Sequence, residues 1–100
     1  MDPRIMIDRH TIADFCRRHR IRKLALFGSV LREDFRPDSD VDILVEFESG
    51  VTTGLIHLAG MELELSEILR RNVDLRTPAE LSRYFRNEVL AHAQVQYAQG

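Results

Sequence analysis

Residues 24–29 read LALFGS, and residues 40–47 read DVDILVEF. The first stretch is an unbroken apolar run that stops at Gly28, which is typical of a buried strand ending in a turn. In the second stretch polar residues alternate with apolar ones, so Asp40 and Asp42 share one face of an extended segment. The sequence therefore predicts a strand over residues 21–27 and a second, clearer strand over residues 40–47.

The remaining pattern predicts helices around these strands. Apolar residues at helical spacing indicate helices over residues 8–19 and 55–71, and a short helical turn fits residues 30–35. Residues 72–75 alternate and form a third predicted strand. Thr77 and Pro78 are start signals for further helices, of which the last spans residues 84–94, and the tail from Val95 is expected to be frayed.

These elements predict one α/β (α+β) domain over residues 1–100, with a small mixed sheet, helices packed on one face and the carboxylate face open. In the long helix, the residues expected to pack inward are Leu55, Leu58, Met61, Leu65, Ile68 and Leu69. The acidic residues expected to point outward are Glu62, Glu64 and Glu67.

Composition narrows the class of protein. With 44% hydrophobic and 30% charged residues, the chain has the balance of a globular domain. A net charge of -2 gives no basic field, so direct binding to nucleic acid is not expected. Cys16 is the only cysteine and cannot form an internal disulfide, and the charged first residues do not resemble a secretion signal. No apolar run is long enough to span a membrane. We therefore expect a cytoplasmic protein.

The carboxylates suggest a metal site. Two charges about 4 Å apart repel by roughly 4 kcal/mol at an effective dielectric of 20, so Asp40 and Asp42 favour a cation between them. Mg²⁺ prefers such oxygen ligands together with substrate phosphates. A strand that stops at Gly28-Ser29 and turns into a helix presents N–H groups to an anion. Asp74 supplies a third carboxylate if its strand lies beside the Asp40 strand, which would complete a two-metal phosphoryl or nucleotidyl transfer site.

The spacing of these residues resembles a known signature. Gly28-Ser29, ten intervening residues and Asp40-x-Asp42 are similar to the signature of the DNA polymerase beta-like nucleotidyltransferase superfamily. Residues 26–32 and 36–45 resemble the minimal nucleotidyltransferase (MNT) family, and residues 72–75 with the following Thr77-Pro78 resemble its closing segment. The similarity runs from about residue 24 to residue 90.

The resemblance implies a polymerase beta-like nucleotidyltransferase fold and a role for each matching residue. Asp40, Asp42 and Asp74 would ligate two Mg²⁺ or Mn²⁺ ions, with Asp74 as catalytic base. Gly28 and Ser29 would hold the triphosphate of ATP. Arg32 lies close to this cradle in sequence, where it contacts a phosphate or forms a surface salt bridge. Glu33 departs from the glycine of many relatives and leaves the shape of the following loop open.

The family also implies partners. MNT proteins resemble the antitoxins of pairs whose other member is a HEPN ribonuclease toxin, so the expected reaction is transfer of AMP from ATP to a tyrosine of that toxin. Homo-oligomers are compatible with the sequence. Two alternatives stay open: a non-catalytic module that neutralises a toxin by occlusion, and nucleotidylation of a small molecule.

Several other features have ordinary structural interpretations. The basic cluster over residues 17–23 is more typical of a helix end that complements the macrodipole than of a phosphate site. His10, His19, His57 and His92 show no ligand spacing, so zinc is not expected. Tyr84 and Tyr97 are indistinguishable from surface aromatic residues.

Overall fold

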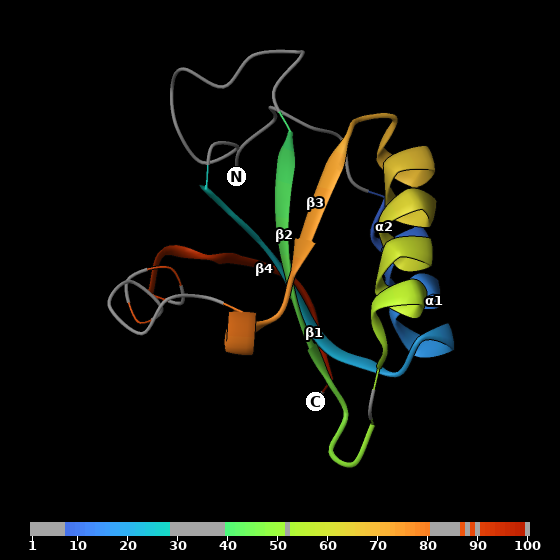
Figure 1. Ribbon diagram of the computed structural model, residues 1–100. Helices are drawn as coiled ribbons and strands as arrows, with labels where there is room; N and C mark the ends of the chain where they lie inside the picture. Colours follow the sequence, from blue (N-terminus) through green and yellow to red (C-terminus); the bar gives the residue numbers. More distant parts are fainter. Residues whose placement is uncertain are drawn as a thin grey trace.

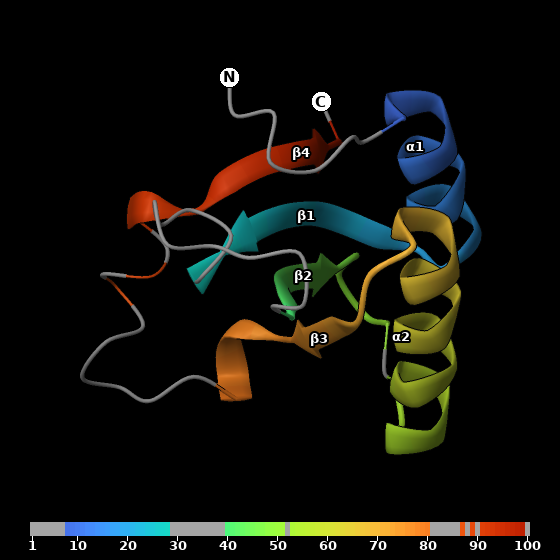
Figure 2. The ribbon, with the colours of Figure 1, turned by 90° about the horizontal axis from the view of Figure 1, so that it is seen from above.

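The computed structural model describes residues 8–28, 40–51, 53–80, 87, 89 and 91–99. The described elements are α1 (Arg9–Arg18), β1 (Ile21–Phe27), β2 (Val41–Phe47), α2 (Leu55–Leu69), β3 (Val73–Arg76), η2 (Pro78–Glu80) and β4 (Gln94–Ala98). The strands form one sheet in the order β3-β2-β1-β4. Figures 1 and 2 show α1 and α2 side by side on one face of this sheet. The predicted fold class is therefore confirmed.

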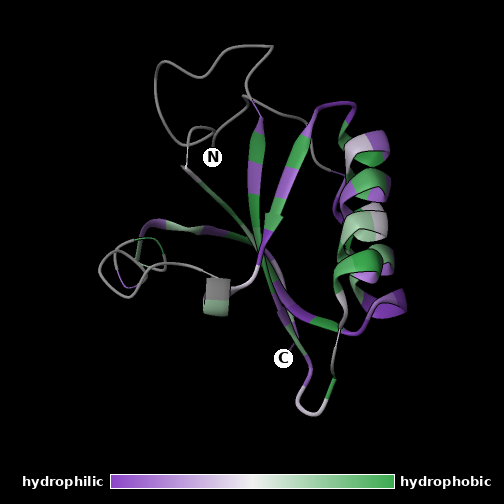
Figure 3. Cartoon of the chain, in the orientation of Figure 1, coloured by the Kyte–Doolittle hydropathy of each residue, from purple (hydrophilic) through white to green (hydrophobic). Residues whose placement is uncertain are grey.

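The sheet is mixed because its pairs run in different directions. β1 is antiparallel to both β2 and β4, whereas β2 and β3 are parallel. Hydrophobic and hydrophilic residues alternate along β2 and β3, as Figure 3 shows. This alternation sends Val41, Ile43 and Val45 toward the helices, where they are buried. Asp42 and Glu46 consequently lie on the opposite face.

The core lies between the sheet and the two helices. α1 begins after Asp8, whose side chain accepts hydrogen bonds from the N–H groups of His10 and Thr11 at 3.0 and 3.4 Å. Cys16 of α1 belongs to this core, and its burial raises the pKa of the thiol to about 12. The residues of this core are Ile12, Phe15, Cys16, Ile21, Leu24, Leu26, Val41, Ile43, Val45, Met61, Leu65, Leu69, Val73 and Leu75.

The face opposite the helices is not fully open. Ala25 and Leu44 share the face of Asp42, and both are buried. η2 lies on this side of the sheet in Figure 1. The prediction of an open carboxylate face is therefore wrong for the middle of the sheet, because apolar side chains on that face are also covered.

The C-terminal prediction needs correction. Residues 94–98 form β4, which pairs with β1, so neither a helix reaching Gln94 nor a frayed tail from Val95 is correct. Tyr97 packs against the core, which gives this segment a hydrophobic contact that local sequence does not reveal. Pro78 begins a short 3-10 helix. The predicted turn over residues 30–35 lies outside the described residues. Within the helix predicted over residues 84–94, residues 87, 89, 91 and 92 are helical, and residues 84–86, 88 and 90 lie outside the described residues.

Three predictions about α2 also need correction. The helix ends at Leu69, because Arg70 has left-handed backbone angles. Leu55 lies at the first turn and is 82% exposed, so the inward-facing stripe begins later. Glu67 is exposed as predicted, but Glu62 and Glu64 are half-buried and bound to neighbouring groups.

Glu64 joins the two helices. Its carboxylate accepts a hydrogen bond from Arg18 at 2.6 Å and lies 3.0 Å from Nε2 of His19. Burial raises the pKa of Glu64, but the hydrogen bonds from Arg18 and His19 outweigh that effect and lower the pKa from its ordinary value. Nδ1 of His19 lies 3.1 Å from Nε2 of His57, so these two histidines meet despite their distance in sequence.

The basic cluster over residues 17–23 forms ion pairs. Arg18 also pairs with Asp14, and Arg22 and Lys23 both pair with Glu46 on β2. These contacts favour a structural role for the cluster. Neither described helix has the length and apolar character needed to cross a membrane.

Candidate active site

The parallel pairing of β2 and β3 brings two predicted site residues together. Asp42 is the register partner of Asp74, and neighbouring strands lie about 4.8 Å apart. Both side chains project from the face opposite the helices, because their neighbours in sequence are buried on the helical face. The third carboxylate is expected only if the strand of Asp74 lies beside the strand that follows Asp40. The structure shows these two strands paired.

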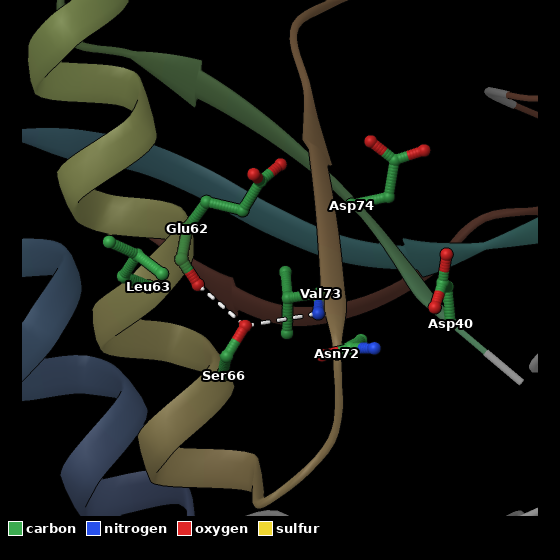
Figure 4. Close-up of a pocket in the computed structure, with 7 residues that line it drawn as sticks. All are labelled: Asp40, Glu62, Leu63, Ser66, Asn72, Val73 and Asp74. Carbon is green, nitrogen blue, oxygen red and sulfur yellow. Dashed lines mark hydrogen bonds between the residues drawn. The ribbon is translucent and has the colours of Figure 1, made fainter. Parts of the chain in front are cut away.

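Asp40 lies just before β2 and is exposed. It lines a cavity of about 420 Å³ with Asp74 and with residues of α2 and the start of β3. Figure 4 shows the carboxylates of Asp40 and Asp74 on the same side of β3, away from α2. The complete lining consists of Asp40, Glu62, Leu63, Ser66, Asn72, Val73 and Asp74. This cavity therefore borders the predicted carboxylate site.

Gly28 completes the described part of the site. Phe27 is the register partner of Asp42, so the end of β1 lies directly against that carboxylate. Gly28 has a φ of +74°, and a Cβ at this position would overlap the Asp42 side chain. Only glycine meets both demands without strain. The structure thus places Gly28, the described residue of the expected phosphate cradle, against the Asp42 carboxylate.

Two predicted nucleotide-binding residues, Ser29 and Arg32, lie outside the described residues, as does Glu33. Among the residues that the structure describes, no three His, Cys, Asp or Glu side chains are already grouped as a metal would require. The donor chemistry nevertheless fits a hard divalent cation, because Asp40, Asp42 and Asp74 offer only carboxylate oxygens. Their roles as metal ligands stay predictions.

Sequence reasoning missed Arg76. Its guanidinium contacts the Asp74 carboxylate through Nε and Nη2, each at 3.2 Å. The spacing of two along β3, which puts both side chains on one face, was the available signal. Both are partly exposed, and exposed ion pairs contribute about 0–1 kcal/mol. Arg76 thus partly neutralises Asp74 without locking that carboxylate away from a cation.

The comparisons with known proteins show the family of this chain. The pattern that defines nucleotidyltransferase domains matches residues 9–95, which include the Gly28 turn and all three aspartates. This chain belongs to the nucleotidyltransferase domain family. The resemblance inferred from Gly28-Ser29 and the three aspartates is therefore confirmed, and the protein is a nucleotidyltransferase.

Two relatives resemble this nucleotidyltransferase in sequence. A provisionally assigned protein adenylyltransferase of Methanocaldococcus jannaschii is 33% identical over 76 residues, which are 76% of this chain and 80% of that protein. The protein adenylyltransferase MntA of Thermococcus cleftensis is 40% identical over 55 residues, which are 55% of this chain and 54% of that protein.

Solved structures extend the likeness to the fold. The structure of a provisionally assigned minimal nucleotidyltransferase is 38% identical, has a TM-score of 0.69, and the match covers 85% of each chain. A toxin-antitoxin complex with AMP-PNP has a TM-score of 0.74 at 21% identity, covering 93% of this chain and 75% of that one. A complex of a tri-AMPylated Shewanella oneidensis HEPN toxin with its MNT antitoxin has a TM-score of 0.66 at 22% identity, covering 91% and 70%.

The contact between Gly28 and Asp42 makes a prediction about glycine substitutions. Gly28→Ala should lower the thermal unfolding temperature and weaken ATP binding, because the new methyl group displaces the Asp42 carboxylate. Gly50→Ala is the matched control, since Gly50 also has a positive φ but no atom near the position of a Cβ. Thermal unfolding and calorimetric titration with ATP measure the two effects. If both variants bind ATP equally well, the close approach of Gly28 to Asp42 does not contribute to ATP binding.

Proposed function

We propose that this nucleotidyltransferase transfers AMP from ATP to a hydroxyl group on a protein. The observation that supports this most is the convergence of Gly28, Asp42 and Asp74 at one end of three neighbouring strands. A phosphate cradle beside carboxylates is the arrangement that nucleotidyl transfer requires, and relatives of this chain are named protein adenylyltransferases.

The proposed reaction assigns a task to each group. The oxygen of the acceptor hydroxyl attacks the α-phosphorus of ATP, the bond from that phosphorus to the bridging oxygen of the β-phosphate breaks, and pyrophosphate leaves. Asp74 takes the proton of the hydroxyl group. Gly28 and Ser29 hold the triphosphate in line, with Arg32 as a further phosphate contact. Mg²⁺ or Mn²⁺ held by Asp40, Asp42 and Asp74 would lower the pKa of the hydroxyl and neutralise the leaving group.

We further propose that the acceptor is a tyrosine of a HEPN toxin, so that the chain acts as an antitoxin in the cytoplasm. A phenol has a pKa of about 10 and needs activation near neutral pH. Structural neighbours include MNT antitoxins bound to HEPN toxins, one of them AMPylated, which supports this partner. An added AMP brings negative charge and bulk, both of which oppose RNA binding.

The surface of α2 supports a protein partner. Ile56 and Leu63 are 91% and 69% exposed, and the small residues Ala59 and Gly60 between them are exposed as well. A helix that carries apolar residues on its exposed side as well as on its buried side often packs against a partner there. Leu63 also lines the cavity that Asp40 and Asp74 border, so a partner on this face reaches the edge of the site.

The metal proposal predicts that ATP binding depends on a divalent ion. Calorimetry should detect ATP binding in Mg²⁺ or Mn²⁺ and its loss in chelator, because the three carboxylates otherwise repel the triphosphate. Asp42→Asn should abolish AMP transfer while the circular dichroism spectrum stays unchanged. Asp14→Asn, an exposed change of the same kind on α1, serves as the control. If ATP binds equally well with and without chelator, Asp40, Asp42 and Asp74 do not hold a metal ion for ATP binding.

The acceptor proposal predicts a mass change on the toxin. Incubation of the cognate HEPN toxin with this protein, ATP and Mg²⁺ should add one or more AMP groups, measured by intact mass spectrometry. The double variant Asp40→Asn with Asp42→Asn should leave the mass unchanged and should fail to protect cells. If that double variant still protects cells, the occlusion alternative is correct instead. If the protein transfers AMP to a small molecule and not to the toxin, the alternative of small-molecule nucleotidylation is favoured.

The α2 surface predicts that a substitution far from the site residues weakens binding to the toxin. Ile56→Glu should weaken binding to the toxin by about tenfold or more, because it places a charge at the centre of an apolar contact. Val95→Glu on β4 is the matched control, since Val95 is also an exposed apolar residue but lies on a different element. Surface plasmon resonance gives both affinities. Similar affinities for Ile56→Glu and the unaltered protein would place the toxin on another surface.

A further inference from the structure

β3 is an edge strand, with β2 on one side and no strand on the other within the described sheet. Along a strand, successive N–H groups point to opposite sides, so those of Val73 and Leu75 point to the side away from β2. Such groups need partners other than a strand. Asp74 lies between them in sequence.

Two side chains of α2 provide these partners. Oγ of Ser66 accepts a hydrogen bond from the N–H of Val73 at 3.1 Å and donates one to the carbonyl oxygen of Glu62 at 2.8 Å. Oε2 of Glu62 accepts from the N–H of Leu75 at 2.7 Å. Figure 4 shows the Ser66 side chain pointing from α2 toward Val73 on β3. α2 thus takes the place of a further strand along this edge.

The contact made by Glu62 is the stronger of the two. A carboxylate that accepts from a backbone N–H forms a short, charge-assisted bond, and the side chain is half-buried. One bond precedes Asp74 and the other follows it, so they fix the strand on both sides of that residue. A slip of β3 by one residue would turn the Asp74 side chain toward the helices.

We propose that Glu62 and Ser66 are positioning residues for Asp74. Their hydrogen bonds hold β3 in the register that pairs Asp74 with Asp42. Both side chains act from α2 and do not touch the atoms that react. This inference rests on the proposed function, because it takes Asp74 as a ligand of the metal ions. It adds that metal affinity depends on the side chains of α2 as well as on the carboxylates.

The test uses Glu62→Ala, Glu62→Gln and Ser66→Ala in the full chain. In Glu62→Ala the charge-assisted bond is lost, so the Leu75 amide should exchange its hydrogen about tenfold faster or more. NMR measures this exchange rate. The Mn²⁺ concentration that gives half-maximal ATP binding should rise by about fivefold or more, and saturating Mn²⁺ should restore binding. Glu62→Gln retains an acceptor oxygen and should recover much of both properties. Ser66→Ala should show a smaller change in both, with exchange affected at Val73.

Glu67→Ala, an exposed change on the same helix, is the control and should match the unaltered protein in both measurements. If Glu62→Ala accelerates exchange at Leu75 but leaves the Mn²⁺ dependence unchanged, Glu62 has a structural role only and the proposal is wrong. If Glu62→Ala does not fold, Ser66→Ala decides, since the loss of the bond to the Val73 N–H should still raise the Mn²⁺ requirement. If the unaltered protein shows no metal-dependent ATP binding, the proposed function fails, and the positioning role fails with it.

Discussion

The register between β2 and β3 is the constraint on which the rest of the structure depends. Because side chains alternate along a strand, one register decides at once which apolar residues enter the core and which carboxylates meet on the other face. With Val41 beside Val73, the same pairing puts Asp42 beside Asp74. Core formation and site formation are therefore not independent, since a sheet paired for burial is already paired for the candidate chemistry.

The sequence predicts those parts of the structure that depend on local patterns. Alternation over residues 40–47 is enough to predict β2 and the face on which Asp42 lies, and helical spacing predicts α1 and most of α2. The glycine that ends β1 is recognisable because residues 24–27, which precede it, are uniformly apolar. The family resemblance rests on the same residues, which explains why the candidate site could be recognised before its geometry was known. The roles of Ser29 and Arg32 remain predictions.

The features that the sequence does not predict depend on contacts between distant segments. Residues 94–98 carry a weak strand pattern, and they become β4 because β1 offers them an edge and the core accepts Tyr97. Glu62 occupies a position typical of a solvated helix face, and its hydrogen bond depends on where β3 lies. His19 and His57 likewise meet only because α1 and α2 pack side by side. Local periodicity carries no information about such pairings.

The pairing of β1 with β4 has a consequence for how the protein is made. β1 is the second described element along the chain, whereas β4 is the last described one, so β1 is synthesised well before β4. On the ribosome, β1 can pair with β2 early, but the backbone groups along its other edge stay unpaired until residues 94–98 have been added. An unpaired edge beside exposed apolar residues is a template for association between nascent chains. The time needed to translate the residues from β2 to β4 therefore sets how long this edge remains exposed.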